Sequence, residues 1–240
     1  MSQDQYVWRY VDLERLVDLL ARKALYLPRG DLLGEAFEGT FPTQSINSRQ
    51  QLFRTFAGRV PQGPPAEWYL SLYRDMQREI REWTYVTCWH IAKHESFAMW
   101  KLYGRAVALR STYARLSAVL AARSVKLVAV RYIDFEKDQF DGNNSITPFM
   151  YKRQEFESER ELRGIWFDED GFNDLTLYGP FDFPLDAGKS IPIEPNELIE
   201  TVVLAPALPA WRRSAITEAC RRFGYAGSIL PSVLDSTPKL

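Results

Sequence analysis

The segment from Lys152 to Phe167, KRQEFESERELRGIWF, constrains the fold of this chain more than any other. Within it, Glu159, Glu161 and Arg163 occupy alternate positions and lead into an apolar run. Alternate side chains of a β-strand share one face, so the spacing predicts three charges on the same face of a sheet. Charged groups on a half-buried face need partners. The segment therefore predicts either a functional site or a cluster of structural ion pairs.

A helical alternative stays open for the same segment, because FESEREL consists of good helix formers. In a helix, Glu159 and Arg163 would form an i, i+4 pair on a solvated face. We favour the strand because the apolar residues 165–167 continue the run before DEDG turns the chain.

Hydrophobic periodicity divides the rest of the chain into short strands and amphipathic helices. Strands are predicted at 6–10, 25–27, 83–90, 106–111, 126–132, 160–167, 175–178 and 198–204. Helices are predicted at 13–24, 45–56, 69–80, 95–103, 113–122 and 209–223. This order predicts an α+β fold, a single domain over 1–240 with a central, mostly antiparallel sheet flanked by helices. The most variable loops are expected near 28–45, 57–66 and 133–148.

Charge and cysteine content narrow the classes of partner and compartment. The 31 acidic and 30 basic residues nearly cancel, so net charge gives no general case for binding nucleic acid or a membrane. Cys88 and Cys220 form neither a metal spacing nor a disulfide framework. No run approaches the roughly 18 apolar residues of a membrane span. We therefore expect a cytoplasmic protein with no membrane partner; the oligomeric state stays open.

Several common catalytic and metal-binding patterns are absent from the sequence. It lacks the serine-hydrolase elbow, the P-loop and the dinucleotide fingerprint. His90 and His94 have the spacing of a zinc helix, but the required glutamate does not follow His90. The acidic residues Asp31, Glu35 and Glu38 offer a magnesium site as an alternative, although such charges more often cap turns. We expect no metal site.

Three distant segments together form a candidate site for breaking a glycosidic bond. Arg9, on the first strand, would bind a diphosphate through bidentate contacts. Ser111, at the end of a later strand, would orient the carboxylate of Glu161. That carboxylate would stabilise positive charge at an anomeric carbon, with Glu159 as its helper.

This arrangement resembles the Arg–Ser–Glu class of ADP-ribosyltransferases, which have an arginine on the first strand, a Ser-Thr-Ser motif and a later Glu-x-Glu. The chain departs from the class where Tyr113 replaces the last serine. The resemblance implies an ADP-ribosyltransferase-like fold, NAD as substrate, and catalysis by Glu161, Glu159 and Ser111. The NAD-binding residues would be Arg9, Tyr10, Tyr103 and Arg163. The alternative is structural: Arg9 pairs with Glu159 or Glu161, and the charges perturb ionisation without catalysis.

The chain as a whole is similar to a bacterial domain family of unknown function. Members carry a WRY-like strand, an (Asp)-Pro-Phe-Glu-Gly loop, an MWxxY helix and a KRxxFxxExExR segment. The matching positions are Phe37, Glu38, Trp100, Tyr103, Lys152, Phe156, Glu159, Glu161 and Arg163, with Ala36 in place of the loop proline. The resemblance implies a cytoplasmic bacterial or phage protein, and the transferase interpretation makes it a toxin or phage-defence effector.

Two further functions stay open. A non-catalytic module would bind nucleic acid or a bacterial protein through basic residues, namely Lys152, Arg153, Arg160, Arg163, Arg212, Arg213, Arg221 and Arg222. A metal-dependent nuclease or hydrolase would combine the acidic group at 31–38 with the late glutamates. We rank the nuclease last.

Overall fold

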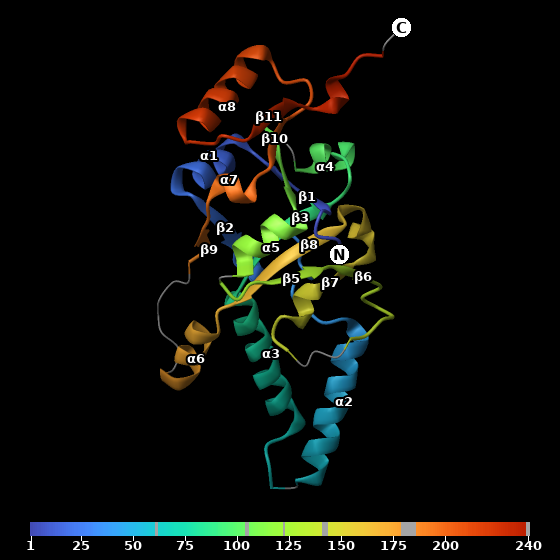
Figure 1. The fold of residues 1–240 in the computed structure, drawn as a ribbon. Coiled ribbons are helices and arrows are strands. Elements are labelled where there is room, and N and C mark those ends of the chain that lie inside the picture. The colour runs from blue at the N-terminus through green and yellow to red at the C-terminus, as the bar shows by residue number, and fades with distance from the viewer. Residues whose placement is uncertain (61, 104–105, 122, 141–143, 179–185, 239–240) are drawn as a thin grey trace.

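A seven-stranded sheet in the order β11-β10-β4-β1-β3-β8-β5 forms the centre of the protein (Figure 1). The computed structural model describes residues 1–240 except 61, 104–105, 122, 141–143, 179–185 and 239–240. Its strands are β1 (Tyr6–Val11), β3 (Thr84–Ile91), β4 (Val107–Thr112), β5 (Lys126–Ala129), β8 (Glu161–Phe167), β10 (Thr201–Leu204) and β11 (Ser228–Pro231). Neighbouring strands are antiparallel except β10 and β11. The predicted α+β class and mostly antiparallel sheet are confirmed.

Helices surround this sheet, and two small sheets extend it. The helices are α1 (Leu13–Arg22), α2 (Thr43–Arg59), α3 (Ala66–Glu82), α4 (Phe97–Leu102), α5 (Tyr113–Ala121), α6 (Glu169–Tyr178), α7 (Pro195–Leu198) and α8 (Ala210–Arg222). The small sheets pair β2 (Ala24–Pro28) with β9 (Gly188–Pro192), and β6 (Arg131–Ile133) with β7 (Tyr151–Arg153). Short 3-10 turns are η1 (Gly30–Leu32), η2 (Thr147–Met150), η3 (Gln154–Glu159) and η4 (Val233–Asp235). No described helix is both long and apolar enough to cross a membrane.

Strand register assigns each side chain of the sheet to one of two faces. Trp8 lies opposite His90, and His90 lies opposite Glu161, so these side chains share the face that we call the carboxylate face. Val7 and Ser111 are also directly opposite each other, on the other side, which we call the helix face. The helix face packs against apolar residues of α1, α5 and α8, including Leu16, Leu116 and Ile216.

Several local expectations differ from the structure. The strand predicted at 126–132 is divided into β5 and β6, and the one predicted at 198–204 begins only at Thr201. Residues 175–178, predicted as a strand, belong to α6. The Asp168 side chain accepts a hydrogen bond from the Gly171 amide, and Glu169 and Asp170 lie in the first turn, so the helix N-terminus is capped and electrostatically favoured. Glu159 does not lie on a strand either, because η3 ends there and β8 begins only at Glu161.

The helices α2 and α3 form an antiparallel hairpin that projects away from the central sheet (Figure 1). Aromatic contacts hold the two helices together, with the rings of Phe53 and Tyr69 stacked at a centroid distance of 6.1 Å. Both helices were predicted, but each is longer than its hydrophobic periodicity indicated.

Candidate functional site

Five charged side chains lie against one another on the carboxylate face of the sheet, and we call them the charge cluster. Its members are Glu38, Lys152, Glu159, Glu161 and Arg163, and none is more than 6% exposed. Residues of this kind are rarely buried unless they are paired. Four members come from the segment 152–163, and folding adds Glu38 from a distant part of the chain.

Two local structures position the three members at 159–163. Glu161 and Arg163 are two residues apart on β8 and therefore share the carboxylate face. Glu159 ends η3, and Arg160 adopts a left-handed conformation with φ of 42° that turns the chain into β8. The Nδ1–H group of His90 donates to the Glu159 carbonyl at 2.6 Å and fixes this turn against β3.

Lys152 is the centre of the cluster. Its Nζ lies 2.5 Å from Oε2 of Glu159, 2.6 Å from Oε1 of Glu161 and 3.2 Å from Oε1 of Glu38. A lysine ammonium has three protons to donate and no acceptor. One cation therefore satisfies oxygens of all three carboxylates.

Arg163 closes the cluster from the other side. Its Nε donates to Oε2 of Glu161 at 2.6 Å, and its Nη2 donates to Oε1 of Glu38 at 2.8 Å. Its Nη1 lies 2.7 Å from Oε2 of Glu38 and donates to the Phe149 carbonyl at 3.1 Å. With all of these donors occupied and the side chain fully buried, Arg163 holds Glu161 and Glu38 in place.

Glu159 and Glu161 differ in their acidity. Burial alone would raise the pKa of Glu161, but the charges of Arg163 and Lys152 outweigh burial and lower that pKa well below its usual range. Burial, followed by the hydrogen bond with Glu161, raises the pKa of Glu159. Three carboxylates face two cations, so the fully ionised cluster carries one excess negative charge. Of Glu159 and Glu161, Glu159 takes up a proton first.

Tyr103 contacts both the charge cluster and the solvent. Its hydroxyl donates to Oε1 of Glu159, while half of the residue, 50%, is exposed. Burial of the hydroxyl and the bond to Glu159 raise its pKa. Tyr10, also predicted to bind NAD, lies on the same face, but its hydroxyl accepts the Ser96 amide at 2.7 Å and its ring packs edge-on against Trp100.

Arg9 and Ser111 do not join this cluster, which corrects the predicted convergence. Register places both on the helix face, while Glu161 lies on the carboxylate face. Arg9 donates to the Tyr26 carbonyl at 3.2 Å and lines a small cavity of about 140 Å³. Ser111 is fully buried and donates to the Leu198 carbonyl at 2.6 Å. The predicted pairing of Arg9 with Glu159 or Glu161 is therefore wrong, and Lys152 and Arg163 are the true partners.

The acidic group at 31–38 does not form the alternative metal site. Asp31 pairs with Arg29 at 2.6 Å, Glu35 pairs with Arg153 at 2.9 Å, and Glu38 belongs to the charge cluster. Within the described residues, no three histidine, cysteine or acidic side chains are grouped so that they could hold a metal ion.

The two histidines do not share a site. His90 is buried on β3, and burial lowers its pKa, which favours the neutral ring. His94 lies beyond the end of β3 and is exposed.

The basic residues considered for nucleic-acid binding do not form one surface. Lys152 and Arg163 are buried in the charge cluster. On α8, Arg213 pairs with Asp235 at 3.0 Å, and Arg221 donates to the Tyr225 carbonyl at 2.8 Å.

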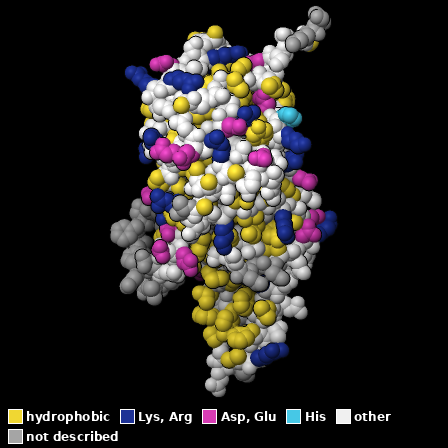
Figure 2. All heavy atoms as spheres, viewed as in Figure 1, with side chains coloured by type: hydrophobic (Ala, Val, Ile, Leu, Met, Phe, Trp, Pro, Cys, Tyr) yellow, Lys and Arg dark blue, Asp and Glu magenta, His cyan; other side chains and the backbone are white. Residues whose placement is uncertain are grey.

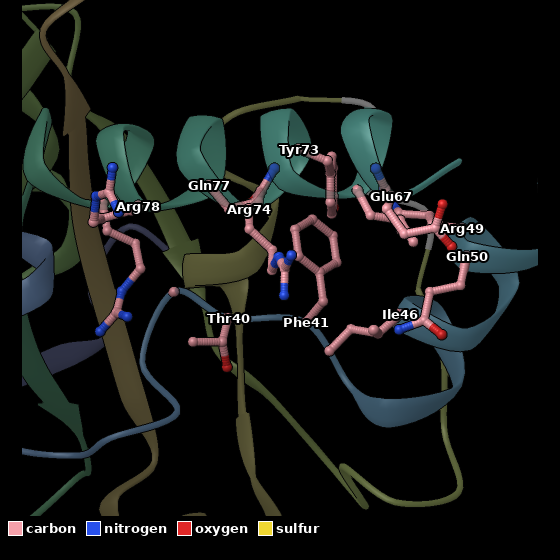
Figure 3. Close-up of a pocket in the computed structure, with 13 residues that line it drawn as sticks. Thr40, Phe41, Ile46, Arg49, Gln50, Glu67, Tyr73, Arg74, Gln77 and Arg78 are labelled. Carbon is pink, nitrogen blue, oxygen red and sulfur yellow. The ribbon is translucent and has the colours of Figure 1, made fainter. Parts of the chain in front are cut away.

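A larger cavity, of about 360 Å³, lies between α2, α3 and the loop 39–41 (Figure 3). Phe41 and Tyr73 point into it, and the guanidinium of Arg49 lies 4.6 and 4.8 Å from their ring centroids. None of the seven residues predicted for catalysis or NAD binding lines this cavity.

Sequence reasoning missed three contributors to the site. Glu38 was assigned to a turn or a metal, and His90 was considered only as part of a zinc spacing. Tyr132 was not considered, yet its hydroxyl accepts the Glu161 amide at 2.7 Å, and burial raises its pKa to about 12. Glu159 and Glu161 already balance the charges of Lys152 and Arg163, so charge gave no signal for Glu38; the available signal was its place among the positions that match the bacterial family.

Comparison with known proteins gave one structural neighbour. No protein-family model matches the chain, and no curated protein matches it in sequence. Among solved structures, Thermus sp. 2.9 DarT in complex with carba-NAD+ aligns with a TM-score of 0.39 and 8% identity, covering 99% of this chain and 100% of that one. The resemblance to a bacterial family stays a prediction.

Proposed function

We propose that the protein is an NAD-dependent ADP-ribosyltransferase whose reacting carboxylates are Glu161 and Glu159. The observation that carries this proposal is a pair of carboxylates that share Lys152, with Glu159 also bonded to the half-exposed Tyr103; the opposite directions of their pKa shifts support it. Environments that separate the pKa values of two neighbouring carboxylates are typical of sites with one ionised group and one proton carrier. The Glu-x-Glu spacing, with Glu159 at the end of η3 and Glu161 at the start of β8, supports the same reaction class.

In this reaction, the bond between C1′ of the ribose and the nicotinamide nitrogen breaks, and the electron pair leaves with nicotinamide. Positive charge develops at C1′, and the ionised Glu161 stabilises it. The acceptor forms the new bond to C1′ and gives its proton to Glu159, whose raised pKa suits a general base. The products are nicotinamide, the ADP-ribosylated acceptor and one proton.

Access to the carboxylates requires Tyr103 to rotate away from Glu159. Its neighbours on α4, Phe97 and Leu102, are 60% and 59% exposed and provide an apolar surface for a nicotinamide or adenine ring. Arg160, exposed directly after Glu159, takes the diphosphate role first given to Arg9. Arg163 is a positioning residue, because the cluster occupies its donors.

The test is nicotinamide release by the purified full chain with NAD and an acceptor, either DNA, RNA or a bacterial protein extract. Glu161→Gln should lower release by about 10²–10⁴-fold. The matched control, Glu157→Gln, changes an exposed carboxylate of the same segment and should leave release unchanged. NAD should also raise the melting temperature of the wild type. Absence of both release and this thermal shift would refute the proposal.

The biological role that follows is that of a toxin or phage-defence effector which modifies a nucleic acid or a bacterial protein. Comparing release with each acceptor separates these targets. Release without any acceptor would instead indicate hydrolysis of NAD, in which water takes the place of the acceptor.

A further inference from the structure

The α2–α3 hairpin buries very little of itself against the rest of the protein. Each helix has 17 residues, yet the side chains that the structure buries are Ser45 in α2 and Ile80 in α3. Helices in proteins owe most of their stability to the packing of an apolar face. A projecting hairpin with so little burial therefore needs another surface to pack against.

One side of the hairpin carries a row of exposed apolar residues, which we call the hydrophobic ridge. Its members are spaced by four residues, with Leu52 and Phe56 on α2, Val60 directly after it, and Trp68, Leu72 and Met76 on α3, each 40–63% exposed. Residues four apart lie on the same side of a helix. The two rows are continuous, because the Phe56 and Trp68 rings both pack edge-on against Tyr69, at centroid distances of 5.5 and 5.0 Å.

The ridge is large enough to be an interface. Figure 2 shows hydrophobic side chains gathered over the projecting part of the molecule, where Figure 1 places α2 and α3. Given these exposed fractions and side-chain areas of roughly 150–250 Å², the ridge presents roughly 600 Å² of apolar surface. Monomeric proteins rarely expose contiguous patches above a few hundred Å². A standard interface buries about 800 Å² per partner, slightly more than half of it apolar.

We propose that the hydrophobic ridge is a dimerisation surface, occupied by the same ridge of a second copy of this chain. Two hairpins related by a two-fold axis would form a four-helix bundle, in which each ridge covers the other. The inference does not depend on the transferase proposal, because no member of the charge cluster lies in the hairpin.

Charge complementarity favours a second copy over an unrelated partner. Helix α2 contains three arginines and no acidic residue, whereas α3 contains four acidic residues and three arginines. Arg59 follows Leu52 by seven residues and Glu79 follows Leu72 by seven, so each charge lies beside the ridge on its own helix. Arg59 is near the tip of the hairpin and Glu79 near its base. In an antiparallel pair of hairpins, Arg59 of each copy therefore lies near Glu79 of the other copy, so the two-fold axis creates two such contacts.

The first experiment measures the mass of the purified full chain by sedimentation equilibrium over a range of concentrations. The wild type should be a dimer, and Leu72→Glu should be a monomer with an unchanged circular dichroism spectrum. The matched control, Val233→Glu, places the same charge on a 67% exposed apolar residue of η4 and should stay dimeric. A wild type that stays monomeric up to roughly 100 μM, a concentration far above the dissociation constants of typical stable interfaces, would overturn the proposal.

A charge exchange tests the orientation and does not depend on the apolar variant. Arg59→Glu should raise the dimer dissociation constant roughly 10-fold, because like charges then meet twice. Adding Glu79→Arg should restore it, whereas Arg54→Glu, an exposed change on the far side of α2, should have no effect. If Arg54→Glu weakens the dimer as much as Arg59→Glu, or if the double variant is not rescued, the antiparallel pairing is wrong.

Discussion

Replacing Arg163 by methionine removes one cation from the centre of the charge cluster and leaves two carboxylates without it. Glu161 loses its bond to Nε at 2.6 Å, and Glu38 loses contacts at 2.7 and 2.8 Å. Removing one partner of a buried ion pair typically costs about 3–5 kcal/mol, because the other charge stays buried and unpaired. For a domain of this size, that corresponds to a fall in melting temperature of roughly 6–20 °C.

The loss should depend on pH with a definite sign. The pKa of Glu161 in the folded protein is lowered, chiefly because its charge partners outweigh burial. Its ionisation therefore contributes stability that is present above the unfolded pKa of about 4.3 and is lost as pH falls. Since Arg163 is a main cause of the lowered pKa, the difference between wild type and Arg163→Met should be largest near pH 7 and should shrink below about pH 4.

Chemical unfolding of both proteins at pH 7 and pH 3, followed by circular dichroism, measures this difference. Arg131→Met is the matched control, because it removes the same charge from an exposed position of β6 and should change stability by less than about 0.5 kcal/mol. The reasoning is refuted if Arg163→Met costs no more than the control at pH 7. It is equally refuted if the cost is the same at both pH values.

Three further predictions concern groups outside the charge cluster. Ser111→Ala should cost about 1–3 kcal/mol in urea unfolding, because the buried Leu198 carbonyl loses its donor, and should leave nicotinamide release unchanged; a selective loss of release would restore a role for Ser111 in the site. Gly39→Ala should cost about 1–3 kcal/mol, since Gly39 has φ of +68° and an added Cβ would lie 2.5 Å from Cζ of Phe149; an unchanged melting temperature would contradict this packing. Burial raises the pKa of the Cys220 thiol to about 11, so Ellman's reagent at pH 8 should label it only after unfolding, and rapid labelling of the native protein would show that it is accessible.

Local patterns in the sequence were sufficient to predict most helices and strands. For α1, Asp12 followed by leucines at helical spacing predicted both the start and the buried face, and the Asp12 side chain accepts the Arg15 amide at 2.8 Å. The spacing of Glu161 and Arg163 correctly predicted two charges on one face of β8. These features depend on neighbours within a few residues, which a single sequence contains.

The same reasoning could not predict which residues contact Glu161 and Arg163. Whether Arg9 and Ser111 face Glu161 depends on the register of β1 against both β3 and β4, and a shift of one residue would move each side chain to the other face. Glu38 reaches Arg163 only after the loop before α2 has folded back onto the sheet. Such contacts are determined by packing over long sequence separations, so charge type and order alone do not reveal them.

The position of β1 has a consequence for synthesis on the ribosome. This strand precedes every other strand of the sheet in the sequence, yet it lies in the middle, between β3 and β4. Its first partner in the sheet, β3, begins at Thr84. At about 5–20 residues per second, the nascent strand waits several seconds for that partner, with its apolar residues uncovered. Early residues of this chain are therefore a natural binding site for chaperones during translation.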